Sequence, residues 1–380
     1  MEIHTLHYDR KKGWSLTAQP SIDSHRTLIV LFGASSFIES ANPIRELLAN
    51  YPRSKVIGCS TAGEILGTQI FDESVSAAIV CFDHTDLRMA SAPARSVEDS
   101  FAAGQEIAQQ LNDSELRGIL VLSDGLGVNG SELVRGVNSQ IPPSVVVTGG
   151  LAGDGDRFQR TWVLQDGRPQ SGFVTAVGFY GDHARIGHGS KGGWDRFGPE
   201  RRVTKSKGNV LFELDGRPAL QLYKEYLGDR ADGLPATGLL FPLAVRADHT
   251  DSKSLVRTIL AVNETEHSLT FAGDIPEGAL AQLMKANFDR LVQGASEAAF
   301  STQVSTGVDS CTLAIAISCV GRRLVLGGRT EEEIEATLEV LPKGTKQIGF
   351  YSYGELSPFA TGTCDLHNQT MTLTTLSEAA

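Results

Sequence analysis

One histidine near the middle of the chain stands where it could face a flat or bulky group. His188 opens the segment His188-Gly-Ser-Lys-Gly-Gly-Trp194, which is rich in glycine. Because glycine has no Cβ, its backbone can approach a ligand closely. A glycine-rich turn carrying a solvated histidine explains the same pattern, so this segment leaves both interpretations open.

Polar, glycine-bearing segments also follow several apolar runs that have the character of strands. They are GCSTAGE (58–64), TGGLAGDGD (148–156), SYGE (352–355) and CDLHNQT (364–370). Loops at strand ends are where pockets form in α/β proteins. We therefore expect a ligand pocket to which both halves of the chain contribute. Its candidate lining residues are Cys59, Ser60, Thr61, Glu64, Tyr353, Glu355, Asn368 and Gln369.

Catalysis finds no positive support in the sequence. There is no G-x-S-x-G elbow, no Walker A motif and no H-E-x-x-H, which are the patterns of common hydrolases, phosphate binders and zinc proteases. Cys59 could act as a nucleophile with a distant histidine, but a lone cysteine without an identifiable partner more often packs in a core. We expect a binding protein and not an enzyme.

The bulk composition narrows the class of protein. The 380 residues carry a formal net charge of −11 and are 41% hydrophobic. This charge argues against nucleic acid or an anionic membrane as partner, and no stretch has the roughly 18 apolar residues of a membrane span. The N-terminus lacks an apolar signal segment, and the five cysteines contain no C-x-x-C pair. We expect a soluble cytoplasmic protein with reduced thiols.

The expected elements alternate between strands and helices in both halves. Apolar runs ending in glycine, such as 27–33 and 55–64, predict buried strands. Amphipathic segments predict helices at 97–111, 131–137 and 331–341. The clearest is 277–295, where Leu280, Leu283, Met284, Phe288, Leu291 and Val292 share one helical face.

The order of these elements is similar in the two halves. Each half has a helix, strands, a helix, a strand, a helix and further strands, and each ends with a strand that runs into glycine. This predicts an α/β protein of two related lobes, with mixed sheets flanked by helices and a ligand cleft between the lobes or at their strand ends. We expect a lead-in at 1–26, an amino-terminal domain at 27–215 and a carboxy-terminal domain at 216–380.

Taken together, several motifs resemble the FIST family of sensory domains. They are VIGCSTAGEI (56–65), TGGLAGDG (148–155), VTKSKGNVLFELDGRPALQLYKEYLG (203–228), GDIPEGALAQLMKAN (273–287), GFYSYGELSP (349–358) and LHNQTMTLT (366–374). The resemblance covers nearly the whole chain and implies a ligand-binding sensory role. His367, in the last of these motifs, is then a further candidate for the pocket.

In its length and in the segment GSKGGWDRFGPERRVT (189–204), the chain resembles the nitric-oxide-sensing haem proteins of this family, called NosP. That resemblance implies non-covalent haem b, nitric oxide as ligand and a sensor histidine kinase as partner. An iron ligand would be a neutral imidazole, with His188 as first candidate and His249 as the alternative. Trp194 and Phe197 would wall the porphyrin, and Arg196, Arg201 and Arg202 lie near for its propionates.

Two functions from different classes of ligand therefore remain. The first is a haem-b nitric oxide sensor that regulates a histidine kinase. The second is a haem-free FIST module that binds a small polar metabolite, such as an amino acid. A homodimer is compatible with the sequence, which does not determine the oligomeric state.

Overall fold

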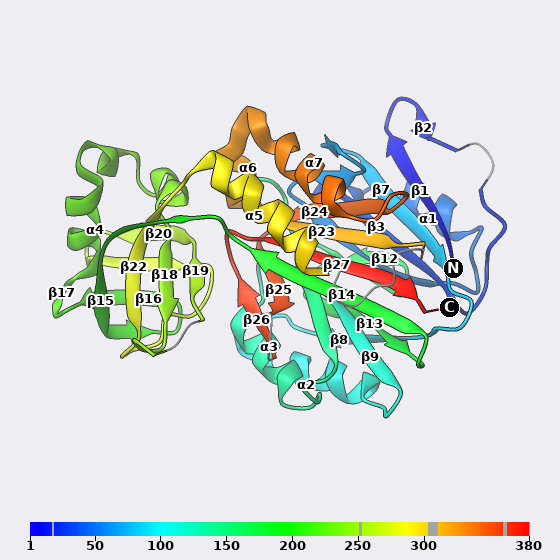
Figure 1. Cartoon of the computed structure of the whole chain (residues 1–380), viewed down its shortest axis with the longest axis horizontal. Helices are drawn as coiled ribbons and strands as arrows, with labels where there is room; N and C mark the ends of the chain where they lie inside the picture. Colours follow the sequence, from blue (N-terminus) through cyan, green and yellow to red (C-terminus); the bar gives the residue numbers. More distant parts are fainter. Residues whose placement is uncertain (17–18, 251–252, 303–310, 360–362, 380) are drawn as a thin grey trace.

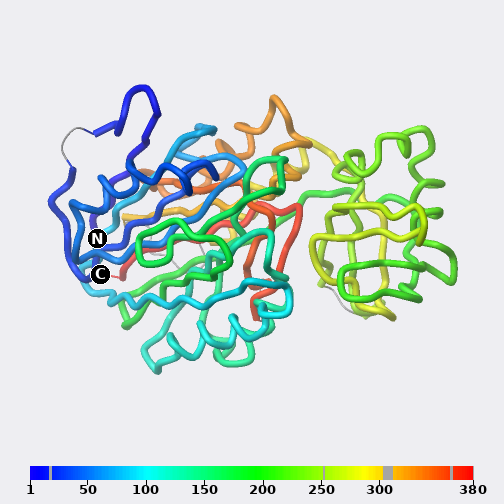
Figure 2. The backbone as a smooth tube through the Cα atoms, turned by 180° about the vertical axis from the view of Figure 1, so that it is seen from behind, coloured from blue at the N-terminus to red at the C-terminus, as the bar shows by residue number. Residues whose placement is uncertain are grey.

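The computed structural model describes residues 1–16, 19–250, 253–302, 311–359 and 363–379. The chain forms a large α/β core and a smaller β-rich domain built from residues 195–285 (Figure 1). Two extended segments join this inserted domain to the core, one entering it and one leaving it (Figure 1). Seen from behind, both chain ends lie on the core, far from the inserted domain (Figure 2).

Residues 1–81 form the first unit of the core. Its apolar strand β3 is buried along its whole length, as a strand covered on both faces must be. Helix α1 begins with a proline in its first turn, where the missing N–H costs nothing. The elements of unit 1 are β1 (Glu2–Asp9), β2 (Gly13–Trp14), β3 (Thr27–Ala34), α1 (Asn42–Leu48), β4 (Lys55–Thr61), β5 (Glu64–Leu66), β6 (Gln69–Phe71) and β7 (Val75–Cys81).

Residues 86–180 form a second unit with a similar sequence of elements, in which helix α2 stands where unit 1 has the short strand β2. The side chain of Asn129 accepts hydrogen bonds from two backbone N–H groups at the start of α3 and so caps that helix. The elements of unit 2 are β8 (Asp86–Pro93), α2 (Ser100–Leu111), β9 (Leu116–Ser123), α3 (Gly130–Asn138), β10 (Val146–Leu151), β11 (Val163–Gln165), β12 (Arg168–Gln170) and β13 (Phe173–Tyr180).

The third unit is interrupted by the inserted domain and resumes at residue 288. Asn287 caps α5, as Asn129 caps α3. The elements of unit 3 are β14 (Ala184–Lys191), α5 (Phe288–Ser301), β23 (Leu313–Cys319), α6 (Val320–Leu326), α7 (Thr330–Val340), β24 (Lys346–Ser352), β25 (Gly354–Pro358), β26 (Cys364–His367) and β27 (Met371–Glu378).

Each unit builds most of one mixed sheet and lends a hairpin to another. The strand orders are β12-β11-β4-β3-β7-β1-β2 in sheet 1, β26-β25-β10-β9-β13-β8 in sheet 2 and β6-β5-β24-β23-β27-β14 in sheet 3. In every sheet a parallel pair (β3/β4, β9/β10 or β23/β24) is flanked by antiparallel strands. Hairpin β5-β6 of unit 1 joins sheet 3, β11-β12 of unit 2 joins sheet 1, and β25-β26 of unit 3 joins sheet 2. The exchange therefore closes a ring of three units.

The inner faces of the three sheets share one apolar core. Phe32 of sheet 1 and Phe350 of sheet 3 pack with ring centroids 4.6 Å apart, and Leu120 and Leu122 of sheet 2 belong to the same cluster. Helices cover the outer faces, with α1 on sheet 1, α2 and α3 on sheet 2, and α5 and α7 on sheet 3 (Figure 1). Burial on both faces explains why the central strands are continuous apolar runs.

The inserted domain is a twisted eight-stranded antiparallel sheet with one helix against it. Strand β15 belongs to both parts of this sheet, because it pairs with β22 along one stretch and with β16 along another. Its elements are β15 (Asp195–Lys207), β16 (Val210–Leu214), β17 (Arg217–Pro218), α4 (Ala219–Leu227), β18 (Leu243–Arg246), β19 (Leu255–Arg257), β20 (Ile259–Asn263), β21 (Ser268–Phe271) and β22 (Leu280–Lys285).

The expected α/β architecture with mixed sheets flanked by helices is confirmed. The predicted repeat is present, but it has three copies in the core where two were expected, because the segment 195–285 is an insertion into the third copy. The expected boundary at 215 and 216 lies between β16 and β17, inside the inserted domain.

Two predicted segments are wrong in their secondary structure. Residues 1–26 are more than a lead-in, because β1 pairs along β7 and buries Ile3 and Leu6. The predicted helix 277–295 is strand β22 followed by α5. Both faces of β22 are largely buried, so its apolar residues fall by chance at a spacing that also fits a helix. The helix begins only after the cap at Asn287.

In the parts of the chain that the structure covers, no helix combines the length and the apolar character needed to cross a lipid bilayer.

Candidate functional site

The three units meet at three similar turns, which we call the corners. Each corner follows the second strand of a parallel pair, where the chain crosses to the neighbouring sheet, and each places an acidic residue directly after a glycine. The corner pairs are Gly63-Glu64 in unit 1, Gly153-Asp154 in unit 2 and Gly354-Glu355 in unit 3.

Backbone hydrogen bonds connect the corners in a ring. The N–H of Ala62 donates to the carbonyl of Tyr351 in unit 3 at 2.8 Å. The N–H of Tyr353 donates to Leu151 in unit 2 at 3.1 Å, and the N–H of Gly153 donates to Ser60 in unit 1 at 3.0 Å. Each corner is thus bonded to a strand end of the next unit.

Two of the corners are closed around a buried carboxyl group. The carboxyl of Glu64 accepts hydrogen bonds from the hydroxyl of Thr61 and from both the N–H (3.2 Å) and the hydroxyl (2.7 Å) of Ser74. Glu355 is held in the same way, by the hydroxyl of Ser352 at 2.7 Å and by the N–H (3.2 Å) and hydroxyl (2.9 Å) of Thr370. Burial raises the pKa of both carboxyl groups to about 8, against the hydrogen bonds that lower it.

The third corner holds an ionised carboxylate. Asp154 accepts backbone N–H groups of Phe158, Gln159 and Arg160, each at 2.9 Å, and the hydroxyl of Tyr353. Burial alone would raise the pKa of Asp154, but these hydrogen bonds outweigh it and hold the pKa below its usual value. The chain from 155 to 160 therefore wraps around Asp154 and presents its own side chains outward.

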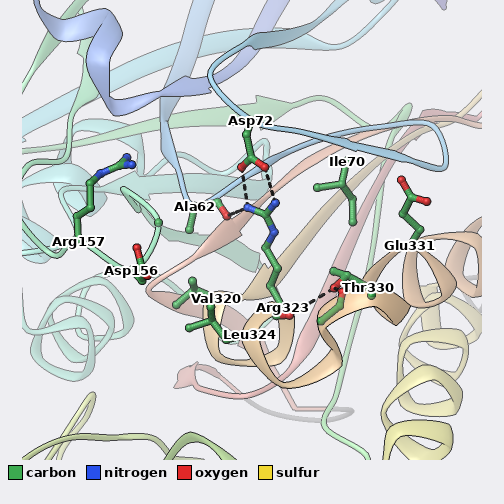
Figure 3. Close-up of a pocket in the computed structure, with 13 residues that line it drawn as sticks. Ala62, Ile70, Asp72, Asp156, Arg157, Val320, Arg323, Leu324, Thr330 and Glu331 are labelled. Atoms are coloured by element: carbon green, nitrogen blue, oxygen red, sulfur yellow. Dashed lines mark hydrogen bonds and ion pairs between the residues drawn. The ribbon is translucent and has the colours of Figure 1, made fainter. Parts of the chain in front are cut away.

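A pocket of about 630 Å³, which we call the junction pocket, lies beside the ring of corners and is lined by all three units. Unit 1 contributes Ala62, Ile70 and Asp72, unit 2 contributes the loop at 155–157, and unit 3 contributes residues of α6 and the start of α7 (Figure 3). Its size is that of pockets for small-molecule ligands.

Arg323 of α6 is the best-fixed charged group in this pocket. Its guanidinium donates to the carbonyl of Ala62 at 2.6 Å and forms a bidentate pair with Asp72 at 2.7 and 2.8 Å (Figure 3). Gly63 makes room for it, because a Cβ on Gly63 would lie 2.4 Å from Arg323 Nη1. The ion pair thus joins unit 3 to unit 1 across the pocket.

Further charges stand around the ion pair. Asp156 and Arg157 lie on the loop of unit 2 and Glu331 lies on α7, on opposite sides of the pocket (Figure 3). Apolar contact surface comes from Ile70 and Val320. Cationic and anionic groups within one hollow can bind a molecule that carries both charges.

The residues predicted for the pocket are buried in the corners and the core beside it and do not line it. Glu64 and Glu355 are closed inside their corners, Tyr353 is bonded to Asp154, and Cys59 lies in the central core, where burial raises the pKa of its thiol. A buried, protonated thiol cannot serve as a nucleophile.

The other predicted pocket residues are also interior. Ser60 accepts the N–H of Trp162 at 3.0 Å. His367 is bonded to the carbonyl of Ser357 at 2.9 Å, and burial lowers its pKa to about 4. Asn368 is fully buried. Of the four predicted segments, 58–64 and 148–156 contribute residues to the pocket, and 352–355 and 364–370 do not. Asp72, Arg157 and Arg323 are not among the predicted residues, since no local pattern distinguishes them from surface charges.

The residues considered for haem lie in separate places. Trp194 is buried in a cluster with Met284 and Leu291, and its Nε1 donates to the carbonyl of Gln369 at 2.8 Å. In the inserted domain, Arg201 is bonded to Tyr226 and Asp215, and His249 has a side chain that is 70% exposed. Beside His249, Arg246 forms a salt bridge with Glu200. Arg201 lies on β15 and His249 follows β18, whereas His188 lies on β14 of the core.

His188 itself lies on β14, opposite Thr374 of β27. Its imidazole is half-buried, and burial lowers its pKa, which keeps it neutral at neutral pH. Among the described residues, no three His, Cys, Asp or Glu side chains are grouped so as to hold a metal ion.

Comparisons with known proteins agree with the motifs. The family model described as the FIST N domain matches residues 27–217, and the FIST C domain matches 219–358. An uncharacterized protein of Methanocaldococcus jannaschii is 25% identical in an alignment of 269 residues, which covers 64% of this chain and half of that relative's length. The crystal structure of a cyanuric acid hydrolase from A. caulinodans is 11% identical, covers 78% of this chain and all of its own, and has a TM-score of 0.19, too low to carry an argument. With two tandem matches that together cover most of its length, the chain belongs to the FIST family.

Proposed function

We propose that this protein is a ligand-binding sensor and that the junction pocket takes a small zwitterionic metabolite such as an amino acid. The observation that supports this most directly is the convergence of cationic and anionic side chains from three units on one hollow of about 630 Å³. A carboxylate would bind Arg157 and Arg323, and an ammonium group would bind Asp156 or Glu331.

Binding would act on the ion pair between Arg323 and Asp72. The Asp72 side chain is 64% exposed, whereas that of Arg323 is 25% exposed, so a ligand carboxylate can displace the aspartate without moving the arginine. Displacement would replace a bond between unit 1 and unit 3 by bonds through the ligand. A ligand that favours one of two arrangements shifts the population between them, and this is the signal that a partner would detect.

The test is a thermal-shift and calorimetric screen of haem-free protein with amino acids, amines and simple carboxylates. A bound ligand should raise the midpoint of unfolding with the logarithm of its concentration once that concentration exceeds Kd. The variant Arg157→Gln should weaken binding about tenfold. Arg160→Gln is the matched control, since Arg160 lies on the same loop but pairs with Glu39 outside the pocket. Equal binding by both variants, or no stabilisation by any zwitterion, would refute the proposal.

The second candidate is the haem-b sensor of nitric oxide that regulates a partner histidine kinase. What favours it is the neutral, half-buried imidazole of His188. Protein produced with excess haem precursor should then show a Soret band that His188→Ala removes and His249→Ala retains. Absence of the band in the unmodified protein would exclude this candidate and leave the metabolite proposal standing.

A further inference from the structure

A second pocket, of about 710 Å³, lies between the inserted domain and the core. One wall is formed by α3 and β26 of the core, and the other by β18, β19 and the segment 274–279 of the inserted domain. It is distinct from the junction pocket, with which it shares no lining residue. We call it the interdomain pocket.

Arg257 of β19 is a buried cation in this pocket, with only 4% of its surface exposed. Its guanidinium donates to two main-chain carbonyls, Asp274 at 3.1 Å and Leu366 of the core at 2.9 Å. Within the part of the chain that the structure describes, it forms no ion pair, and no hydrogen bond of its Nη2 is found. A buried charge without a counter-charge is costly to maintain.

The electrostatics of the site agree with this geometry. Burial lowers the pKa of Arg257 to about 10, and the nearby charges of Asp274 and Asp365 raise it only in part. An anion bound to the guanidinium would offset the rest of the free-energy cost of burying the Arg257 charge. The lining carries four cations, Arg135, Arg246, Lys253 and Arg257, and three carboxylates, Asp274, Glu277 and Asp365, so one further negative charge balances it better than two.

The remaining surface of the interdomain pocket is mostly apolar. Leu255 of β19, Val134 of α3 and Phe359 after β25 contribute to it. The hydroxyl of Ser131, at the start of α3, is buried on the same wall and has no hydrogen-bond partner. The site therefore offers a buried cation, an unused hydroxyl donor and an apolar hollow in one place.

We propose that the interdomain pocket binds a monocarboxylate with an apolar or aromatic tail, and that Arg257 and Ser131 hold its carboxylate. The ligand would contact the inserted domain and the core at once. Its binding would favour the arrangement in which these two bodies close on it.

The experiment is calorimetric titration of the full chain with octanoate and phenylacetate as probes. Octanamide keeps the tail without the charge, and acetate carries the same single charge without the tail; both should bind at least tenfold more weakly. Arg257→Gln should reduce octanoate affinity at least tenfold, and Arg257→Lys should retain part of it.

Because Arg257→Gln removes buried bonds and can fail to fold, a second variant keeps the proposal testable. Leu255→Asp adds a negative charge to the half-buried lining of an edge strand and should abolish octanoate binding. Leu260→Asp, at a position that is 43% exposed and outside the pocket, is the matched control and should bind normally. Unchanged binding by folded Leu255→Asp, a loss shared by Leu260→Asp, or no binding of either probe would overturn the proposal. Since Arg157→Gln affects only the junction pocket, failure of one site is distinguishable from failure of the other.

Discussion

The corners of units 1 and 3 differ from the corner of unit 2 although all three have the same backbone plan. Glu64 and Glu355 are buried carboxyl groups with a raised pKa, each closed by a hydroxyl three residues earlier and by the start of a later strand. Asp154 has a lowered pKa and is held by three backbone N–H groups of its own loop.

The difference explains why unit 2 lines the pocket with the loop that follows its corner. An aspartate is one methylene shorter than a glutamate, and Leu151 stands where the other corners have Thr61 and Ser352. The carboxylate of Asp154 is therefore satisfied by the loop at 155–160, which must fold around it. That loop carries Asp156 and Arg157 to the pocket rim. The corners of units 1 and 3 thus enclose their carboxyl groups, whereas the corner of unit 2 is followed by a loop whose charged side chains line the pocket.

The largest expected effect comes from breaking the ionised corner. Asp154→Ala leaves three part-buried backbone donors and the Tyr353 hydroxyl without their acceptor, and should cost about 3 kcal/mol of unfolding free energy at pH 7. Urea denaturation measures this loss. Asp156→Ala, on the same loop but exposed, should stay within about 0.5 kcal/mol of the parent. A loss below about 1 kcal/mol for Asp154→Ala would contradict the role given to it.

The next effect separates two equivalent glycines. Gly63 has φ 131° and faces the Arg323 guanidinium, so Gly63→Ala should cost about 2 kcal/mol. Gly354 has no positive φ, and the nearest atom to a Cβ there would be the end of the flexible Leu366 side chain at 2.9 Å, with Leu151 and Asn368 at ordinary contact distances of 3.5 and 3.7 Å. Gly354→Ala should therefore cost less than about 1 kcal/mol. Equal losses in urea denaturation would show that the two corners are not distinguished by this contact.

The two kinds of corner should also respond oppositely to pH. The folded pKa of Glu64 and Glu355 is about 8, above the unfolded value, so the folded state retains protons that the unfolded state releases. Their contribution to stability is complete below the unfolded pKa near 4.5 and is lost as pH rises toward 8, by on the order of 1 kcal/mol per pH unit for each group. The contribution of Asp154, whose pKa is lowered, is present above 3.8 and is lost on acidification.

Urea midpoints between pH 5.5 and 7.5 test this difference. Glu64→Gln should reduce the fall in stability with rising pH, because the amide does not titrate. The same slope in parent and variant would show that the buried carboxyl is ionised throughout this range.

The smallest expected effect concerns the outer cover of the ionised corner. Phe158 stacks on Tyr353 with ring centroids 4.4 Å apart but is 47% exposed, so Phe158→Ala should cost only about 0.5 kcal/mol. It should leave the pH dependence unchanged, because neither ring titrates near neutrality. A loss above about 2 kcal/mol would place Phe158 among the groups that hold the corner together.

Much of the local structure could be predicted from local patterns. The apolar run at 27–33 and the helix at 131–137 are present as β3 and α3, because burial and a cap at Asn129 are encoded within a few residues. The sequence indicates that the glycine-bearing turns at 58–64, 148–156 and 352–355 are strand ends, and in the structure they meet at the corners. The prediction for 277–295 was wrong because a strand buried on both faces and an amphipathic helix can share the same apolar spacing.

The sequence by itself determined the central buried strands, such as β3, the helix caps and the three turns that form the corners, since these depend on neighbours along the chain. Only the tertiary structure decided which hairpin joins which sheet, and with it the number of repeats. It alone placed Arg323 against Asp72, which is 251 positions away, and Arg257 against Leu366. Pairing between distant strands leaves no period in the sequence, so the pockets that it creates are lined by residues that look like ordinary surface charges.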